Sequence, residues 1–197
     1  MPYTQEHRAR TRERIVASAQ MLFSRRGFTG VSIDEIMGDA GLTRGGFYNY
    51  FKTKEELYAE AVTRILSSPA AQRWSGHQAS GTALARAFLI HYLSQENADN
   101  RENCCSLIAL PSDVARSGEP VKRAYHQVLE YMIGNLEKGL AGPGSRRSAM
   151  GLAALCIGGM VVARAVEDPE LRQEIMEAAR EMALSASGWD KPPATAE

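Results

Sequence analysis

The densest group of chemically useful side chains lies within residues 41–54. Four aromatic residues, Phe47, Tyr48, Tyr50 and Phe51, stand there within five positions. Residues four apart share a helix face, so Phe47 and Phe51 suit a core. Tyr48 turns outward, where its hydroxyl can donate a hydrogen bond to a phosphate. This segment is therefore the first candidate for a phosphate-binding surface.

Two consecutive glycines, Gly45 and Gly46, precede the aromatic residues. A glycine costs ~1 kcal/mol in a helix relative to alanine. A pair of them at a helix start therefore indicates that the backbone must approach something bulky closely. The edge of a DNA groove is one such partner.

Four helices are expected to position this segment. Apolar residues at helical spacing from Ile15 predict the first helix, which Gly27 ends. Ser32 and Glu35 have the spacing of a capping box, in which each side chain bonds the other residue's amide. Thr43 and Thr53 are expected to cap the third and fourth helices. The four helices cover about residues 5–26, 33–39, 44–50 and 54–65, which is a helix-turn-helix layout.

The rest of the chain also has helical periodicity, and no useful strand alternation appears. Gly, Pro and polar segments separate five further helices, and the segment 188–197 is expected to be a flexible tail. The sequence thus predicts an all-α protein with about nine helices. The five further helices are expected at about residues 82–95, 104–117, 120–141, 146–167 and 169–186.

The charges of the chain sum to zero but are unevenly distributed. Residues 1–54 hold nine basic and five acidic residues, net +4, whereas residues 55–197 hold fourteen and eighteen, net −4. Four of the basic residues, Arg8, Arg10, Arg12 and Arg14, alternate near the start of the chain. A basic terminal segment is typical of a phosphate-binding module, and a solvated helix start is the alternative.

Composition excludes several other classes. With 44% apolar and 23% charged residues, the chain is neither disordered nor fibrous. The longest apolar stretch has 15 residues, below the ~20 needed to cross a bilayer, and the first residues lack the apolar core of a signal peptide. Three cysteines without metal-site spacing predict reduced thiols, no metal and a cytoplasmic protein.

The run from Thr11 to Leu57 closely resembles the DNA-binding module of the TetR family of transcriptional repressors. The matching elements arrive in family order: a Phe-x-x-x-Gly-Phe turn after the first helix, Val-Ser-Ile, Gly-Leu-Thr, Tyr-x-x-Phe and a lysine. The resemblance implies a helix-turn-helix DNA-binding domain at residues 1–54 and a helical ligand-binding and dimerisation domain at residues 55–187. It implies a repressor that binds a near-palindromic operator as a dimer and is released by a small-molecule inducer, with no cofactor.

The resemblance also places individual residues on DNA. The helix after Thr43 becomes the recognition helix, and Thr43 and Arg44 are best placed for base edges, since arginine can bond guanine in a bidentate pair. The lysine and tyrosine of the motif are implied to grip phosphates. The expected DNA-binding residues are Thr29, Ser32, Thr43, Arg44, Gly45, Gly46, Tyr48, Asn49, Tyr50 and Lys54.

The helix expected at residues 146–167 is apolar nearly all round and rich in small residues, which indicates burial against a second subunit. The alternative is a core helix of a monomer. With the last helix it fits a four-helix dimer interface. The expected interface residues are Leu152, Leu155, Gly158, Gly159, Val162, Ile175 and Met182.

Candidate ligand contacts come from apolar helix faces that carry aromatic or polar groups, although ordinary packing explains such stripes equally well. They are Phe88, His91, Tyr92, Cys104, Tyr125, Leu129 and Met132. Cys104 and Cys105 open a helix, where a thiol pKa is lowered. A cysteine stands at the same helix start in one branch of the family, so an oxidant- or electrophile-sensing regulator is an alternative.

Two other classes remain open at this point. One is a cysteine hydrolase that uses Cys104 with His91 or His126, although no catalytic motif accompanies these residues. The other is a helical ligand-binding or partner-binding protein that no longer binds DNA. The intact Arg44, Tyr48 and Lys54 argue against the latter.

Overall fold

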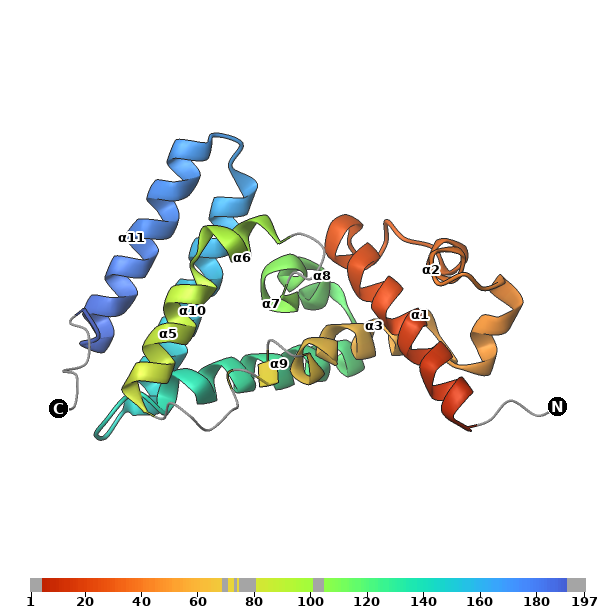
Figure 1. Cartoon of the computed structure of the whole chain (residues 1–197), viewed down its shortest axis with the longest axis horizontal. Helices are drawn as coiled ribbons and strands as arrows, with labels where there is room; N and C mark the ends of the chain where they lie inside the picture. Colours follow the sequence, from red (N-terminus) through yellow and green to blue (C-terminus); the bar gives the residue numbers. More distant parts are fainter. Residues whose placement is uncertain (1–4, 69–70, 73, 75–80, 101–104, 191–197) are drawn as a thin grey trace. The chain divides into compact units, whose positions relative to one another are not determined.

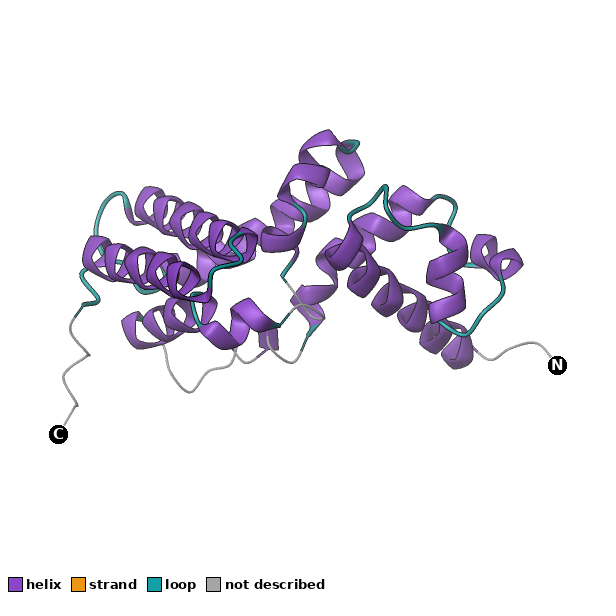
Figure 2. Cartoon of the chain, turned by 90° about the horizontal axis from the view of Figure 1, so that it is seen from above, coloured by secondary structure: helices purple, strands orange, loops and turns teal. Residues whose placement is uncertain are grey.

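The structure is a computed structural model that describes residues 5–68, 71–72, 74, 81–100 and 105–190. The regular elements in these ranges are all helices (Figure 1, Figure 2), which confirms the expected all-α class. They are α1 (Gln5–Arg26), α2 (Ile33–Asp39), η1 (Arg44–Asn49), α3 (Lys54–Thr63), η2 (Arg64–Ser67), α5 (Thr82–Tyr92), α6 (Gln95–Asp99), α7 (Ser106–Ala109), α8 (Pro111–Arg116), α9 (Glu119–Glu137), α10 (Ser145–Ala165) and α11 (Pro169–Ser187).

The described residues contain more helices than the nine expected, because three expected helices are interrupted. The helix expected over 54–65 ends as α3 at Thr63 and is followed by the 3-10 helix η2. The helix expected over 82–95 ends at Tyr92, and Ser94 caps α6 by accepting a hydrogen bond from the Asn97 amide at 3.2 Å. The helix expected over 104–117 is split into α7 and α8. Pro111 begins α8, and since proline has no amide to donate it cannot continue the preceding helix.

The chain divides into two compact units, each with its own packing. Unit 1 consists of residues 1–67 and 101–128, and unit 2 of residues 68–100 and 129–197. The packing boundary therefore differs from the functional boundary expected after Lys54. The division into DNA-binding and ligand-binding domains at that residue stays a prediction.

Unit 1 is built around α1, which packs against α2, α3, η2 and α7. Its centre is an aromatic cluster in which the ring centroids of Phe23 and Phe28 lie 4.8 Å from that of Tyr58. From the second half of the sequence, the Ser106 hydroxyl in α7 donates to the Val62 carbonyl at 3.0 Å. Residues far apart in the sequence thus complete one core.

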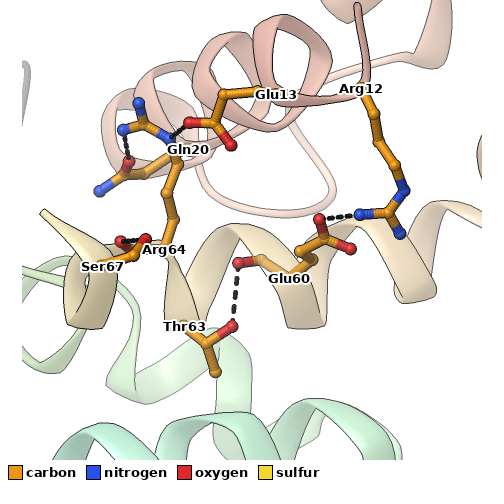
Figure 3. A network of polar contacts seen from close by, with 7 residues as sticks. All are labelled: Arg12, Glu13, Gln20, Glu60, Thr63, Arg64 and Ser67. Atoms are coloured by element: carbon orange, nitrogen blue, oxygen red, sulfur yellow. Dashed lines mark hydrogen bonds and ion pairs between the residues drawn. The ribbon is translucent and has the colours of Figure 1, made fainter. Parts of the chain in front are cut away.

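Polar contacts join α1 to α3 and η2 at two levels (Figure 3). In the second half of α3, Glu60 forms an ion pair with Arg12 of α1. At η2, the Arg64 guanidinium donates to Glu13 at 2.8 Å and to the Gln20 side-chain oxygen at 2.7 Å. The contact of Arg64 with Gln20 is partly buried and that with Glu13 is exposed, so polar contacts add to the apolar packing between the two elements.

Unit 2 contains a long helical hairpin in which α10 and α11 lie side by side (Figure 1). The two helices approach closely at Gly159, where a β-carbon would lie 2.7 Å from that of Ala179. Gly188 ends α11 with a φ of +71°, and Trp189 is buried. The Trp189 carbonyl accepts a hydrogen bond from Arg86 Nε at 2.8 Å. The expected tail thus begins with an anchored residue, and its segment 191–197 lies outside the described residues.

α10 is the one helix in the described ranges that is long and apolar enough to cross a membrane. An 18-residue window has a mean hydropathy of 1.6, and 33% of that window is buried. The helix has 21 residues, so it is longer than the 15-residue apolar stretch found in the sequence. Core helices of water-soluble proteins pass the same test, so length and composition do not decide between the two.

Candidate nucleic-acid interface

The predicted capping box at the start of α2 is present. The Glu35 amide donates to Ser32 Oγ at 3.2 Å, and the Ser32 amide donates to Glu35 Oε2 at 2.7 Å. The Ser32 amide and the Arg26 guanidinium stabilise the charged carboxylate and lower the pKa of Glu35 to about 2. The end of α1 and the start of α2 are therefore joined through Glu35, beside the exposed Ser32 hydroxyl.

The expected recognition helix is a 3-10 helix, η1, and not an α-helix. The Gly46 amide donates to the Thr43 carbonyl three residues earlier, at 3.0 Å. Two glycines at its start explain the difference, because glycine has little preference for the α-helix. Thr43 occupies the cap position as expected, but its side chain makes no capping hydrogen bond. Its exposed hydroxyl is left for another partner.

Neither glycine is required by packing within the chain. A β-carbon at Gly45 would meet nothing within 4 Å, and one at Gly46 would make an ordinary contact with Met37 at 3.6 Å. Both have negative φ values, which any residue can adopt. The space outside η1 is therefore open to a ligand, in agreement with the sequence interpretation.

The aromatic residues of η1 and of the two positions after it divide as the spacing predicted. Phe47 and Phe51 are buried and stacked, with ring centroids 5.8 Å apart. Tyr48 is 64% exposed, and its ring meets Phe47 edge-on at 5.2 Å. Tyr50 is partly buried and Asn49 is exposed. The buried rings fix η1 to unit 1 and leave the Tyr48 hydroxyl on the outside.

Arg44 at the start of η1 is exposed and pairs with Asp34 of α2, with Nη1 2.9 Å from Oδ2. Both side chains remain more than half exposed, so the pair itself adds little stability. The ion pair instead holds the Arg44 guanidinium at the start of η1, near the capping residue Thr43. The sequence interpretation missed Asp34, because nothing local links these residues across the turn.

Lys54 does not extend into solvent as expected for a phosphate contact. Its ammonium donates to the Phe28 carbonyl and lies 4.3 Å from the centre of the Phe28 ring. Partial burial lowers the pKa of Lys54. The structure therefore places Lys54 inside unit 1, where it supports the turn that leads to the exposed Thr29.

The four alternating arginines have separate partners. Arg8 donates to the Asn49 carbonyl at 2.8 Å, and Arg14 donates to the Ala40 carbonyl at the end of α2. Arg12 pairs with Glu60 of α3, and Arg10 pairs with Glu6 on the surface of α1. Arg8 thus brings positive charge to the end of η1, whereas Arg12 and Arg14 mainly hold helices together.

Comparison with known proteins agrees with this geometry. Residues 15–61 match the family model described as bacterial regulatory proteins, tetR family. The transposon Tn10 TetC protein of Escherichia coli is 46% identical over 64 residues, which cover 32% of each chain. The NemR repressor of E. coli is 33% identical over 69 residues, 29% of this chain and 35% of NemR.

The segment of residues 15–61 belongs to the TetR family. The matches span about a third of the length of the curated relatives. Over the whole chain the likeness is one of fold. The structure of reduced E. coli NemR aligns with a TM-score of 0.74 at 22% identity, covering 89% of this chain and 96% of that one. A SmeT–triclosan complex aligns with a TM-score of 0.64 at 24% identity, covering 95% of this chain and 98% of that one. NemR is named as a transcriptional repressor, and other relatives are named as transcriptional regulators.

The candidate ligand contacts of this chain fall in different places. Phe88, Tyr92 and Met132 are buried in unit 2, and His91 and Leu129 are partly exposed there. The Trp74 ring lies 5.4 Å from both Phe88 and His91, a packing partner that the sequence interpretation missed. Tyr125 belongs to unit 1, where its hydroxyl donates to the Leu107 carbonyl at 3.3 Å. Cys104 lies outside the described residues.

A cavity of about 320 Å³ in unit 2 contains none of these candidates. It lies where the end of α5 and the start of α6 face α11. Within the described ranges, no cluster of His, Cys, Asp and Glu is suited to a metal. The residues that line the cavity are Leu93, Gln95, Pro169, Arg172, Gln173, Met176, Glu177 and Arg180.

The expected dimer residues divide between the two sides of the α10–α11 hairpin. Val162 is 51% exposed and Met182 is 63% exposed. Gly158 is also exposed, and Leu155 and Ile175 are partly exposed. These five remain available to a partner.

Two of the expected dimer residues face inward instead. Leu152 is buried within unit 2, and Gly159 lies against Ala179 of α11. This packing leaves Leu152 little surface for a second subunit. The sequence did not indicate this, because α10 is apolar on several sides and its periodicity could not assign a face; the interface itself stays a prediction. Leu171 of α11 is a further exposed apolar residue. We call the set Leu155, Val162, Leu171, Ile175 and Met182 the hairpin face.

Proposed function

We propose that the protein is a ligand-responsive transcriptional regulator of the cytoplasm. In this proposal it represses by binding a near-palindromic operator as a dimer, and a small molecule releases it. The observation that carries the proposal is η1. Buried Phe47 and Phe51 fix this element, while Thr43, Arg44 and Tyr48 are exposed along it.

The two ends of η1 have different roles in the proposed complex. Arg44 reaches a guanine in the major groove, where a bidentate pair is worth ~1–3 kcal/mol of discrimination. Tyr48 and Thr29 donate to phosphates and set the register of the domain on the duplex. The Ser32 hydroxyl donates to Glu35 Oε2 at 2.8 Å in the free chain and exchanges this bond for one to a phosphate. Lys54 acts indirectly, through the Phe28 carbonyl that it bonds.

The dimer is proposed from the hairpin face, a set of exposed and partly exposed apolar side chains on two adjacent helices. Exposed apolar patches of this kind mark interaction sites. A two-fold dimer places two recognition elements about 34–36 Å apart or at a multiple of that distance, which matches a palindrome of two half-sites.

The inducer is proposed to be a small apolar molecule with an aromatic part. The solved SmeT relative is bound to triclosan, and unit 2 of this chain offers the adjacent rings of Trp74, Phe88 and His91. The dimer is proposed to have two conformations that differ in the distance between its recognition elements. A ligand that binds more tightly to the conformation that does not fit the operator shifts the protein toward that conformation.

A gel-shift experiment tests the proposal. The full chain is mixed with the DNA upstream of its own coding region at two salt concentrations, with unrelated DNA of equal length as the control. Specific retardation that weakens with salt is expected, because binding to phosphates releases counterions. Equal binding to both DNAs, or none, would overturn the proposal. The variant Gly45→Ala adds a methyl group that meets nothing inside the chain, so reduced binding by this variant supports contact at η1.

A second candidate is a thiol-sensing regulator, which the solved structure of reduced NemR favours by fold. Cys105 precedes α7 and is partly exposed, whereas Cys156 is buried and its pKa is raised to about 12 by burial. Mild alkylation or peroxide followed by mass spectrometry decides this candidate. It fails if neither Cys104 nor Cys105 reacts faster than Cys156.

A further inference from the structure

The turn after α1 is held from outside the helix-turn-helix segment. The Phe28 amide donates to Asp113 Oδ2 of α8 at 2.9 Å, across 85 positions of sequence. This turn carries Thr29 and leads to Ser32, two of the proposed phosphate contacts. An acidic residue in the second half of the chain therefore fixes part of the DNA-binding surface.

Asp113 is itself held in place. Its other carboxylate oxygen, Oδ1, accepts a hydrogen bond from Arg116 at 2.8 Å, and its carbonyl accepts one from the Ser117 hydroxyl at 2.8 Å. The Asp113 side chain is 18% exposed. A carboxylate that is partly buried and bonded at both oxygens has one orientation, so it sets the position of its partner.

The opposite side of the turn is fixed as well. The Phe28 carbonyl accepts the Lys54 ammonium, and the Phe28 ring stacks on Tyr58 with centroids 4.8 Å apart. Gly27 has a φ of +70°, and a β-carbon there would lie 2.6 Å from Asp113 Oδ2. The sequence Gly27-Phe28 thus fits its carboxylate partner closely, and a larger residue at 27 would push Asp113 away.

We infer that Asp113 is a positioning residue for DNA binding: it anchors the Phe28 amide and thereby sets the placement of Thr29 and Ser32. The inference rests on the proposed function. It assigns α8 a role in operator affinity although α8 lies outside the segment that resembles a DNA-binding module.

The change in charge alone predicts that replacing Asp113 with a neutral residue strengthens DNA binding. Loss of the anchor predicts weaker binding, so the experiment distinguishes the two effects. Removing a carboxylate from unit 1 raises its positive charge, and this by itself strengthens attraction to DNA. Loss of the anchor weakens binding instead. Glu119→Ala is the matched control, because Glu119 is an exposed carboxylate of the same unit and its ion pair is with Arg123 four residues later.

The experiment measures operator affinity of the full chain by fluorescence anisotropy and exchange of the Phe28 amide by NMR in the absence of DNA. Asp113→Ala is expected to weaken operator binding about tenfold, since a hydrogen bond to a charged group is lost, and to speed exchange of the Phe28 amide. Asp113→Asn retains an acceptor oxygen and is expected to bind within about twofold of wild type. Glu119→Ala is expected to bind as tightly as wild type or more tightly.

The inference is overturned if Asp113→Ala binds DNA as tightly as Glu119→Ala, or if the Phe28 amide exchanges at the wild-type rate. Should Asp113→Ala not fold, Asp113→Glu keeps the charge and displaces the carboxylate, and it must show the same loss. If wild type fails to bind specific DNA, the proposed function fails. The exchange rate of the Phe28 amide then still decides whether Asp113 anchors the turn.

Discussion

Replacing Val162 and Met182 with glutamate is expected to convert the protein from a dimer to a monomer. Both side chains belong to the hairpin face and are 51% and 63% exposed. Full burial of a Val or Met side chain contributes ~1.5–3 kcal/mol. About half of that, ~1 kcal/mol or slightly more for each side chain, remains to be gained on dimerisation.

A two-fold interface uses each residue twice, so the double variant alters four side chains. The lost apolar contribution is therefore ~4 kcal/mol, which raises the dimer Kd about a thousandfold. Buried glutamates add a desolvation cost in the same direction. A dimer with a nanomolar Kd would thus dissociate in the micromolar range.

Sedimentation equilibrium over a range of protein concentrations measures this change. Ala83→Glu with Ala87→Glu is the matched control, because both alanines are exposed on α5 and the control adds the same two charges. The control is expected to remain a dimer. A double variant that sediments with the wild-type Kd would refute the assignment of the hairpin face, as would a wild-type protein that is monomeric at tens of micromolar.

Three further outcomes are expected. Arg44→Ala should reduce discrimination at one base position by ~1–3 kcal/mol, whereas Lys54→Ala should weaken binding to all sites alike. Fluorescence anisotropy on a set of operator variants distinguishes these two effects. The same pattern of affinities for both protein variants would contradict both roles. The lowered pKa of Glu35, about 2 against 4.5, means that its carboxylate stabilises the fold above pH 4.5 and that this contribution disappears as the pH falls toward 2. The difference in urea stability between wild type and Glu35→Gln should therefore shrink over that interval, and a constant difference would exclude the mechanism. With iodoacetamide at about pH 8, mass spectrometry should find Cys105 modified well before Cys156, whose thiol is buried with a pKa of about 12; equal rates would count against the structure of unit 2.

Local signals in the sequence predicted the first part of the fold well. The capping residues Ser32 and Thr53 begin α2 and α3 as expected, because a cap depends only on residues within one turn. The same holds for the inward and outward division of Phe47 and Tyr48. The 3-10 geometry of η1 was missed, although Gly45 and Gly46 carried a signal for it.

Contacts between distant segments could not be predicted in this way. Asp113 reaches Phe28 across 85 positions, and Asp34 reaches Arg44 across a turn whose geometry no short pattern encodes. The place of Lys54 in the motif predicted a phosphate contact, but its ammonium donates a hydrogen bond to the Phe28 carbonyl. A pattern supplies the residue type, whereas the partner depends on the packed structure.

The two ion-paired levels between α1 and the α3–η2 segment have a mechanical consequence. Arg12 and Glu60 join the elements at one level, and Arg64 joins them to Glu13 and Gln20 at the other (Figure 3). Two crosslinks along a helix resist both bending and rotation, whereas one would act as a pivot. A displacement of the end of η2 at Ser67 is therefore expected to tilt α1 and α3 together. η1 would move with them, because its Phe47 ring stacks on Phe51, whose ring Arg12 covers at 4.5 Å.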